Sequence, residues 1–378
     1  RDNTIILYSG NTKVAFKTND KLAWLGRKLA ERFERAQKSM LHQLAQPKLA
    51  LYKKQLRMGQ IPKPSEDTME KLAPKIFPWI ENKCATTCKI HYDEKNGEQI
   101  RYYRNAYRDN DKFKLYYTSL PVLNHEIETH GAFAFIPDSH YESLDDQGNL
   151  RFTGPILATI DVDLNYKMEY YELTERVQDL LDFLDEIGIN WFLAHSGNES
   201  FHVKFYLPLL PLEEINETPD KWFLLPRTNS FETYARRRES EMPLLFVHDL
   251  VQILVLGYNY WTEKSQVSID QFPKFNSRGK YDCFFDTRIG VHQGARCPGS
   301  FHMKSGRFCT LLNDIPSTQG RVDVLTSEEY VLDHLEVLDY IEPEEQVMQR
   351  NLKRTRDYCA DFYRKQFYKL TYERKIFN

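Results

Sequence analysis

One short segment, ILATIDVDL at residues 156–164, constrains the fold of this chain more than any other. Its aliphatic and β-branched residues predict a buried strand, yet Asp161 and Asp163 interrupt it. Because side chains two residues apart in a strand point to the same face, the two carboxylates lie side by side, roughly 6–7 Å apart along the backbone. Carboxylates this close repel each other unless a cation lies between them, so the segment indicates either a divalent metal site or a solvated strand end.

A second segment, HSGNESFHVKFYLP at residues 195–208, combines a tight turn with a strand. Strand alternation places His202 and Lys204 opposite the apolar side chains, on a face that we expect to be open and able to meet a phosphate chain. Ser196 and Gly197 begin the turn, where a hydroxyl and backbone N–H groups can also bind phosphate. The alternative is a polar outer sheet face that binds no ligand.

A third segment, FFDTRIGVHQGARCPGSFHMKSGR at residues 284–307, carries a further carboxylate and several cationic side chains. Asp286 ends an aromatic strand and is the candidate for a third metal ligand. The candidate donors to an anion follow in a loop rich in glycine: Arg296, Ser300, His302, Lys304 and Arg307. Glycine lets such a loop turn sharply enough to direct several donors to one anionic group. The alternative is a basic surface loop.

The order of the expected elements indicates an α+β fold. After residue 130, strands and helices alternate, and we expect them at 131–137, 156–164, 170–188, 190–196, 201–209, 239–257, 281–290 and 307–312. This β-α-β-β arrangement predicts a core that is ferredoxin-like or similar to RNA-recognition motifs (RRM-like). We expect this core at 131–326, an N-terminal helical and α/β region at 1–130, and a basic helical segment at 327–378.

The N-terminal region has its own expected elements. A short strand at Thr4–Ser9 precedes a long helical pattern at about 20–59. Further on, the Asn-Gly pair at 96–97 predicts a hairpin turn between the strands at 88–93 and 99–108.

Charge separates the two ends of the chain from its centre. The 378 residues carry a formal net charge of −3, which excludes a uniformly basic nucleic-acid-binding protein. However, residues 11–60 hold 12 Lys/Arg against 3 Asp/Glu, and residues 346–378 hold 9 against 3. Basic ends around an acidic centre are compatible with an anionic polymer held near a metal site, and equally with solvated helix faces.

The six cysteines show no disulfide-like spacing. No signal-peptide pattern and no apolar run of membrane-spanning length is visible, so we expect a cytoplasmic protein without a membrane partner. Cys84, Cys88 and His91 have a spacing compatible with zinc, but no fourth ligand stands nearby, and we do not expect Zn²⁺.

Together the three segments resemble the motifs of the archaeo-eukaryotic primase superfamily, which includes the primase-polymerases. That family carries a DxD strand, then S-G-x-x-G-x-H, then an Asp followed by R/K-x-P-x-S-x-H-x-K-x-G. Here these motifs read DVD at 161–163, SGNESFH at 196–202, and Asp286 followed by RCPGSFHMKSG at 296–306. Ser200 stands where the family often has glycine. The absence of cysteine between 163 and 196 favours the shorter branches found on plasmids, on phages and beside CRISPR systems.

The resemblance implies a DNA primase-polymerase that joins nucleoside triphosphates on single-stranded or primed DNA. It implies two Mg²⁺ or Mn²⁺ ions held by Asp161, Asp163 and Asp286, with Asp270 and Asp282 as alternatives for the third carboxylate. The residues that it implies for nucleotide binding are Ser196, His202, Arg296, Ser300, His302 and Lys304. Two other functions stay open: a repair polymerase of the same superfamily that extends primers without initiating them, and an RRM-like protein that binds nucleic acid without catalysis.

The stretch IRYYRNAYRDNDKFKLYY at 100–117 is both basic and aromatic. Such a surface stacks bases and holds the phosphates of a single strand, so we expect template contacts from Arg101, Tyr103, Arg104 and Tyr107. An ordinary amphipathic hairpin has the same pattern. The expected partners are therefore a DNA template and primer, nucleoside triphosphates and further domains of the same polypeptide.

Overall fold

The structure is a computed structural model. It describes residues 4–9, 12–17, 63–93, 97–104, 106–109, 112–115, 117–144, 150–164, 169–211, 214, 242–261, 267–269, 283–289 and 294–362. The chain divides into two compact units, residues 1–58 and 59–378. In the first unit, β1 (Thr4–Ser9) pairs antiparallel with β2 (Thr12–Lys17), which confirms the first expected strand. The helix expected at 20–59 lies outside the described residues.

A six-stranded sheet lies at the centre of the second unit, in the order β13-β14-β10-β12-β11-β17. Its strands are β10 (Ile156–Leu164), β11 (Phe192–His195), β12 (Ser200–Leu207), β13 (Val267–Ile269), β14 (Cys283–Thr287) and β17 (Thr310–Leu312). Neighbouring strands pair antiparallel, except that β13 and β14 are parallel. This sheet and its helices confirm the expected α+β class.

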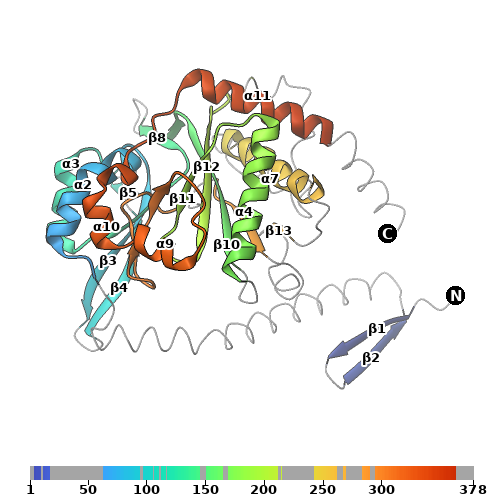
Figure 1. Cartoon of the computed structure of the whole chain (residues 1–378), viewed down its shortest axis with the longest axis horizontal. Helices are drawn as coiled ribbons and strands as arrows, with labels where there is room; N and C mark the ends of the chain where they lie inside the picture. Colours follow the sequence, from blue (N-terminus) through green and yellow to red (C-terminus); the bar gives the residue numbers. More distant parts are fainter. Residues whose placement is uncertain are drawn as a thin grey trace. The chain divides into compact units, whose positions relative to one another are not determined.

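Helices cover one face of this sheet (Figure 1): α4 (Tyr170–Ile187), α7 (Met242–Trp261) and α11 (Glu345–Phe362). Their apolar side chains pack against Ile160 and Val162 of β10 and against the matching face of β12. Because strand residues alternate, burying Val162 here directs Asp161 and Asp163 to the opposite face. The helix α4 ends where the sequence predicts, at Gly188, which caps it in the left-handed conformation with φ of 84°.

The opposite face of the sheet is covered by a second layer (Figure 1), built on a three-stranded sheet in the order β4-β3-β7. The elements of this layer include β3 (Ala85–Asp93), β4 (Gly97–Arg104), β7 (Ala134–Pro137), α2 (Glu66–Ile80) and α3 (Leu120–His130). Asp93 pairs with Gly97, which confirms the expected hairpin. Since β3 also pairs with β7, hydrogen bonds cross the predicted domain boundary at residue 130. The boundaries at 130 and 326 stay predictions.

This second layer corrects one expectation. The face of β12 that carries His202 and Lys204 is not open: the two residues are only 4% and 2% exposed. Side chains from distant parts of the chain cover this face. For example, the ring centroids of Trp79 on α2 and of Phe192 on the neighbouring strand lie 6.2 Å apart. Alternation within β12 shows which residues share a face, but it carries no information about what packs on that face.

The start and the end of the second unit are joined. The indole of Trp79 donates to the carbonyl of Leu338 at 3.0 Å, in the short 3-10 helix η3 (Leu335–Leu338). The Thr68 hydroxyl donates to Glu328 at the start of α10 (Glu328–Asp333). The remaining elements are β5 (Ala106–Asp109), β6 (Lys112–Leu115), β8 (Tyr141–Leu144), β9 (Leu150–Thr153), β15 (Phe301–His302), β16 (Arg307–Phe308) and α9 (Gln319–Leu325).

Candidate functional site

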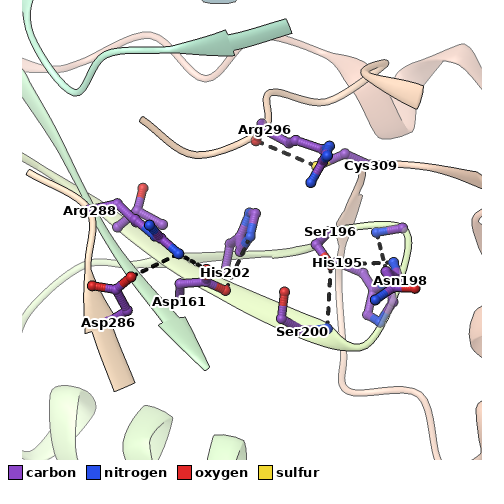
Figure 2. Close-up of polar contacts among 12 residues, drawn as sticks. Asp161, His195, Ser196, Asn198, Ser200, His202, Asp286, Arg288, Arg296 and Cys309 are labelled. Atoms are coloured by element: carbon purple, nitrogen blue, oxygen red, sulfur yellow. Dashed lines mark hydrogen bonds and ion pairs between the residues drawn. The ribbon is translucent and has the colours of Figure 1, made fainter. Parts of the chain in front are cut away.

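The carboxylates selected from the sequence meet around one cation. Asp161 on β10 stands directly opposite Asp286 on β14. One guanidinium nitrogen of Arg288 lies 3.2 Å from the Asp161 carboxylate and 2.8 Å from the Asp286 carboxylate (Figure 2). Asp163 follows on the same face of β10, opposite Ser200, and its charge also acts on Arg288. The structure therefore brings Asp161, Asp163 and Asp286 together, while Asp270 and Asp282 lie outside the described residues.

Sequence reasoning missed Arg288. Its backbone N–H donates to the Thr159 carbonyl at 2.8 Å, which continues the pairing of β14 with β10 beyond the end of the strand. Alternation then places Arg288 on the same face as Asp286, two residues earlier. The signal was present in the letters DTR at 286–288, an acidic and a basic residue at strand spacing.

His202 on β12 flanks Asp161 from the other side. Its Nε2 lies 3.4 Å from Asp161 Oδ1, in a directly opposed pair of the β10–β12 register. Burial lowers the pKa of His202, and the attraction of Asp161 offsets this only in part, so the imidazole is neutral at pH 7.

Asp161 stays ionised despite its burial. Burial acts to raise the pKa of this carboxyl, but His202, the charge of Arg288 and a hydrogen bond from Ser200 together hold the pKa well below its usual range. A buried carboxylate that is already ionised can accept a cation without first losing a proton.

Buried nitrogen atoms cluster beside this carboxylate. His202 Nδ1, His302 Nδ1 and Arg296 Nε have no hydrogen-bond partner within the described part of the chain. Burial, together with the charges of Arg296 and Lys304, lowers the pKa of His302 to about 3, so this ring is also neutral. Leaving a buried polar atom without a partner costs roughly 1–3 kcal/mol, and such a cluster is therefore a site at which a polar ligand gains hydrogen bonds.

Two further cationic residues of the third segment are more accessible. Lys304 is exposed in the turn between β15 and β16. Arg307, which the sequence also offered as an anion donor, forms an ion pair with Asp323 instead.

The turn at 196–200 is held by hydrogen bonds of its own. The Ser196 hydroxyl accepts the N–H groups of Asn198 and Ser200, both at 3.3 Å, and the Gly197 N–H is donated to His195 at 3.1 Å (Figure 2). These three N–H groups have partners within the turn, and the expected contact of the turn with phosphate stays a prediction. The turn is fixed from outside as well, because the Ser305 hydroxyl donates to the Gly197 carbonyl.

Ser300 forms a hydrogen bond that connects two parts of the fold. It is fully buried, and its hydroxyl accepts the backbone N–H of Phe135 at 2.8 Å, which ties the loop 296–306 to β7. The predicted contact of Ser300 with a nucleotide stays a prediction.

Two buried lysines lie next to this site: Lys204, which the sequence offered as a possible phosphate contact, and Lys83, which it did not. Lys204 on β12 donates to the Thr159 hydroxyl at 3.2 Å. Lys83, in the turn before β3, packs over the Tyr141 ring at 4.4 Å, and its amine has no hydrogen-bond partner among the described residues. Burial and the charge of Lys204 lower the pKa of Lys83 to about 7. Both lysines also interact electrostatically with the buried Cys297 thiol in the loop 296–306.

The donor set around Arg288 fits a hard divalent cation. Asp161, Asp163 and Asp286 offer carboxylate oxygens, which Mg²⁺ and Mn²⁺ prefer, and Asp161 Oδ1 is buried without a hydrogen-bond partner from the described residues. In the part of the chain that the structure describes, no three His, Cys, Asp or Glu side chains converge closely enough to hold a metal ion as they stand. The guanidinium of Arg288 lies between two of the carboxylates instead.

Two of the three residues with zinc-like spacing have described side chains. Cys84 and Cys88 are buried, and the Cys88 sulfur lies 3.9 Å from the sulfur of Met303. The side chain of His91 lies outside the described residues, so the expectation of no Zn²⁺ stays a prediction.

The predicted template residues belong to two strands, β4 of the second layer and β5. Arg101, Tyr103 and Arg104 belong to β4, and Tyr107 belongs to β5, while their side chains lie outside the described part of the structure. Among the described helices, none has the length and apolar character that crossing a membrane requires.

No protein-family model and no curated protein sequence matches the chain. Among solved structures, the chain is similar to the polymerase domain of Mycobacterium tuberculosis Ligase D in complex with DNA, with a TM-score of 0.45 and 14% sequence identity. The match covers 74% of this chain and 89% of that chain. A likeness of this size carries no argument about function.

Proposed function

We propose that this chain is a DNA-directed nucleotidyltransferase of the primase-polymerase type. It joins the α-phosphate of a nucleoside triphosphate to a 3′-hydroxyl that is aligned on a DNA template. The observation that carries this proposal is the convergence of Asp161 and Asp286 on one guanidinium nitrogen, with Asp163 on the same face. Three carboxylates against one arginine leave an excess of negative charge that suits divalent cations.

In this proposal, Asp161, Asp163 and Asp286 hold two Mg²⁺ or Mn²⁺ ions. Such ions, when bound, lower the pKa of the attacking hydroxyl and neutralise the leaving pyrophosphate. The chain itself supplies position: the pairing of β10 with β14 sets Asp161 against Asp286, and the His202 imidazole orients Asp161.

Arg296, His202 and His302 form the proposed contact with the triphosphate, and Lys304 stands at its exposed edge. Their buried nitrogen atoms gain partners when phosphate oxygens arrive, which offsets the cost of burying them. Ser196 and Ser300 belong to the proposed nucleotide-binding set as well, and their hydroxyls also hold the turn 196–200 and the loop 296–306.

The proposal extends to the architecture of the core. The elements β10, α4, β11, β12, α7 and β14 occur in this order along the chain, with the short strand β13 between α7 and β14. Their strands lie in the order β14-β10-β12-β11, and this arrangement supports the proposed ferredoxin-like or RRM-like core. The two central strands, β10 and β12, are those that carry Asp161 and His202.

The proposed grip on single-stranded template comes from Arg101, Tyr103, Arg104 and Tyr107. Their support is compositional, since alternating basic and aromatic residues hold phosphates and stack bases without reading sequence. Base pairing then selects the incoming nucleotide.

One assay tests the proposal. The full chain receives unprimed single-stranded DNA, labelled nucleotides and Mg²⁺ or Mn²⁺, and the reaction is repeated with an annealed primer. Product without primer supports a primase-polymerase, and product only with primer supports an extending repair polymerase. Absence of product from both reactions contradicts the proposal and supports a binding protein.

The matched variants separate chemistry from folding. Asp161→Ala with Asp163→Ala must remove all product while the circular dichroism spectrum is unchanged. The control, Asp179→Ala with Asp182→Ala on α4, removes two carboxylates far from the proposed site and must keep full activity. Full activity in the Asp161/Asp163 variant contradicts the metal assignment.

A further inference from the structure

The backbone and the side chain of Arg288 are held with different strength. Its backbone is fixed by the hydrogen bond to Thr159 and by the strand that precedes it. Among the described residues, its guanidinium forms ion pairs with Asp161 and Asp286, and the side chain is 34% exposed. The side chain can therefore leave its position toward solvent without any change in the sheet.

The guanidinium also uses the oxygen atoms that a bridging metal requires. The same nitrogen contacts Asp161 Oδ2 and Asp286 Oδ2, at 3.2 and 2.8 Å. A divalent ion that bridges these oxygens takes the place of this nitrogen, and two cations this close repel each other strongly in a partly buried site. Metal and guanidinium therefore exclude one another.

Without any cation, the three carboxylates would destabilise the sheet. Asp161 is only 7% exposed, and Asp286 stands directly opposite it, so their mutual repulsion is poorly screened by solvent. A resident positive charge removes this repulsion when no metal is bound.

We propose that Arg288 is an exchangeable internal cation of the metal site. It neutralises Asp161 and Asp286 in the metal-free protein, and divalent ions displace it toward solvent. It acts as a positioning residue that keeps the carboxylates assembled and weakens metal binding until a nucleotide phosphate offers the guanidinium another anion. This inference rests on the proposed function and adds a competitor to its metal site.

Titration of the full chain with Mn²⁺, followed by the electron paramagnetic resonance signal of free Mn²⁺, tests the exchange. Arg288→Gln removes the competing charge, so we expect Mn²⁺ to bind about tenfold more tightly than to the wild-type chain. The same variant should have a lower midpoint of thermal unfolding in EDTA, and Mn²⁺ should raise that midpoint more than in the wild type.

Two variants keep the result interpretable. Arg288→Lys retains a charge without the planar fork, and should fold in EDTA and bind Mn²⁺ with intermediate affinity. Arg321→Gln removes an exposed arginine that pairs with Asp314, and should bind Mn²⁺ as the wild type does. Mn²⁺ affinity that is equal or weaker in both Arg288 variants overturns the inference.

A second series separates this inference from the proposed function. With Asp161→Asn and Asp163→Asn in the wild-type background, Mn²⁺ binding should disappear. If Mn²⁺ binds neither the wild type nor Arg288→Gln, the metal site itself is refuted and the proposed function falls with it. If Mn²⁺ binds both equally at a site that needs Asp161, only the role of Arg288 is refuted.

Discussion

Two buried histidine–aspartate pairs lie on opposite faces of the central sheet. On the helical face, His248 Nδ1 contacts Asp249 at 3.0 Å, its Nε2 lies 3.4 Å from the Thr287 hydroxyl, and Gln252 donates to the same hydroxyl. On the other face, His202 contacts Asp161, and its second ring nitrogen has no hydrogen-bond partner in the described part of the chain.

The two pairs differ in their hydrogen-bond partners and counter-ions. The polar side chains of the His248 cluster bond to one another, as buried polar groups in a core normally do. In the His202 cluster, several polar atoms have no hydrogen-bond partner among the described residues, and Arg288 is the counter-ion of Asp161. The same residue types therefore pair with one another on one face and, in the proposed function, bind a ligand on the other.

The largest expected effect comes from Asp161. Asp161→Asn keeps the shape of the side chain and removes its charge, so nucleotide incorporation should fall by at least about 10²–10³-fold, as it does when a group that stabilises transition-state charge is lost. Steady-state incorporation on primed DNA measures this. Asp249→Asn in the closed cluster should keep incorporation within a few-fold of wild type, and an equal loss in both variants breaks the comparison.

The next effect concerns the unpaired nitrogen atoms. Arg296→Ala or His202→Ala should raise the KM for nucleotide by about 10–100-fold, since each removes a hydrogen bond to a charged group. The Kd for single-stranded DNA, from fluorescence anisotropy, should change little. Should DNA affinity fall instead while the nucleotide KM holds, these residues serve the template and not the triphosphate.

The closed cluster should respond in stability. Gln252→Met keeps the approximate volume but removes the donor to Thr287, so the free energy of unfolding should fall by about 1–3 kcal/mol. Urea denaturation measures the loss. His202→Gln should lower the free energy of unfolding by a smaller amount, because several atoms of this cluster already lack hydrogen-bond partners. A larger loss for His202→Gln would show that this cluster stabilises the fold too.

The last effect, which is the smallest at pH 7 and grows as the pH falls, is a pH dependence at His195. Burial, the repulsion from His202 when that ring is protonated, and the charge of Arg307 lower the pKa of His195 to about 3, and its Nδ1 accepts the Gly197 N–H. Below pH 6.5 the unfolded chain binds a proton at this residue that the folded chain does not, so stability falls as pH falls toward 3. Relative to His195→Gln, the wild type should lose about 1.4 kcal/mol more per pH unit in that window, measured by urea denaturation at several pH values. Parallel curves for the two proteins would show that His195 is protonated in the fold.

Local pattern predicts much of this molecule. The strand at 156–164 has the bounds that alternation and composition indicate, and α4 ends at the glycine that the sequence offers. The three carboxylates also follow from local pattern, because each lies at a defined position of a strand and the strands pair in register.

What failed depended on contacts between distant segments. The segment RFCTLL at 307–312 was expected as one strand, but it is divided into β16 and β17. The backbone N–H of Cys309 donates to the Ser300 carbonyl, and the Cys309 carbonyl accepts the Gly299 N–H. Cys309 therefore pairs with the loop 296–306, and the strand is interrupted there. The covered face of β12 likewise depends on a layer that alternation within one strand does not describe.

The bond between Trp79 and Leu338 has a consequence for synthesis. The two residues are separated by 259 positions, and α2 is among the first parts of its unit to leave the ribosome. α3 can cover part of α2 early in translation, but η3 appears only after the central sheet has been made, so the Trp79 indole must wait for its hydrogen-bond partner. Chains interrupted before residue 335 lack this bond between the start and the end of the unit, which makes truncated products of this protein targets for chaperones and proteases.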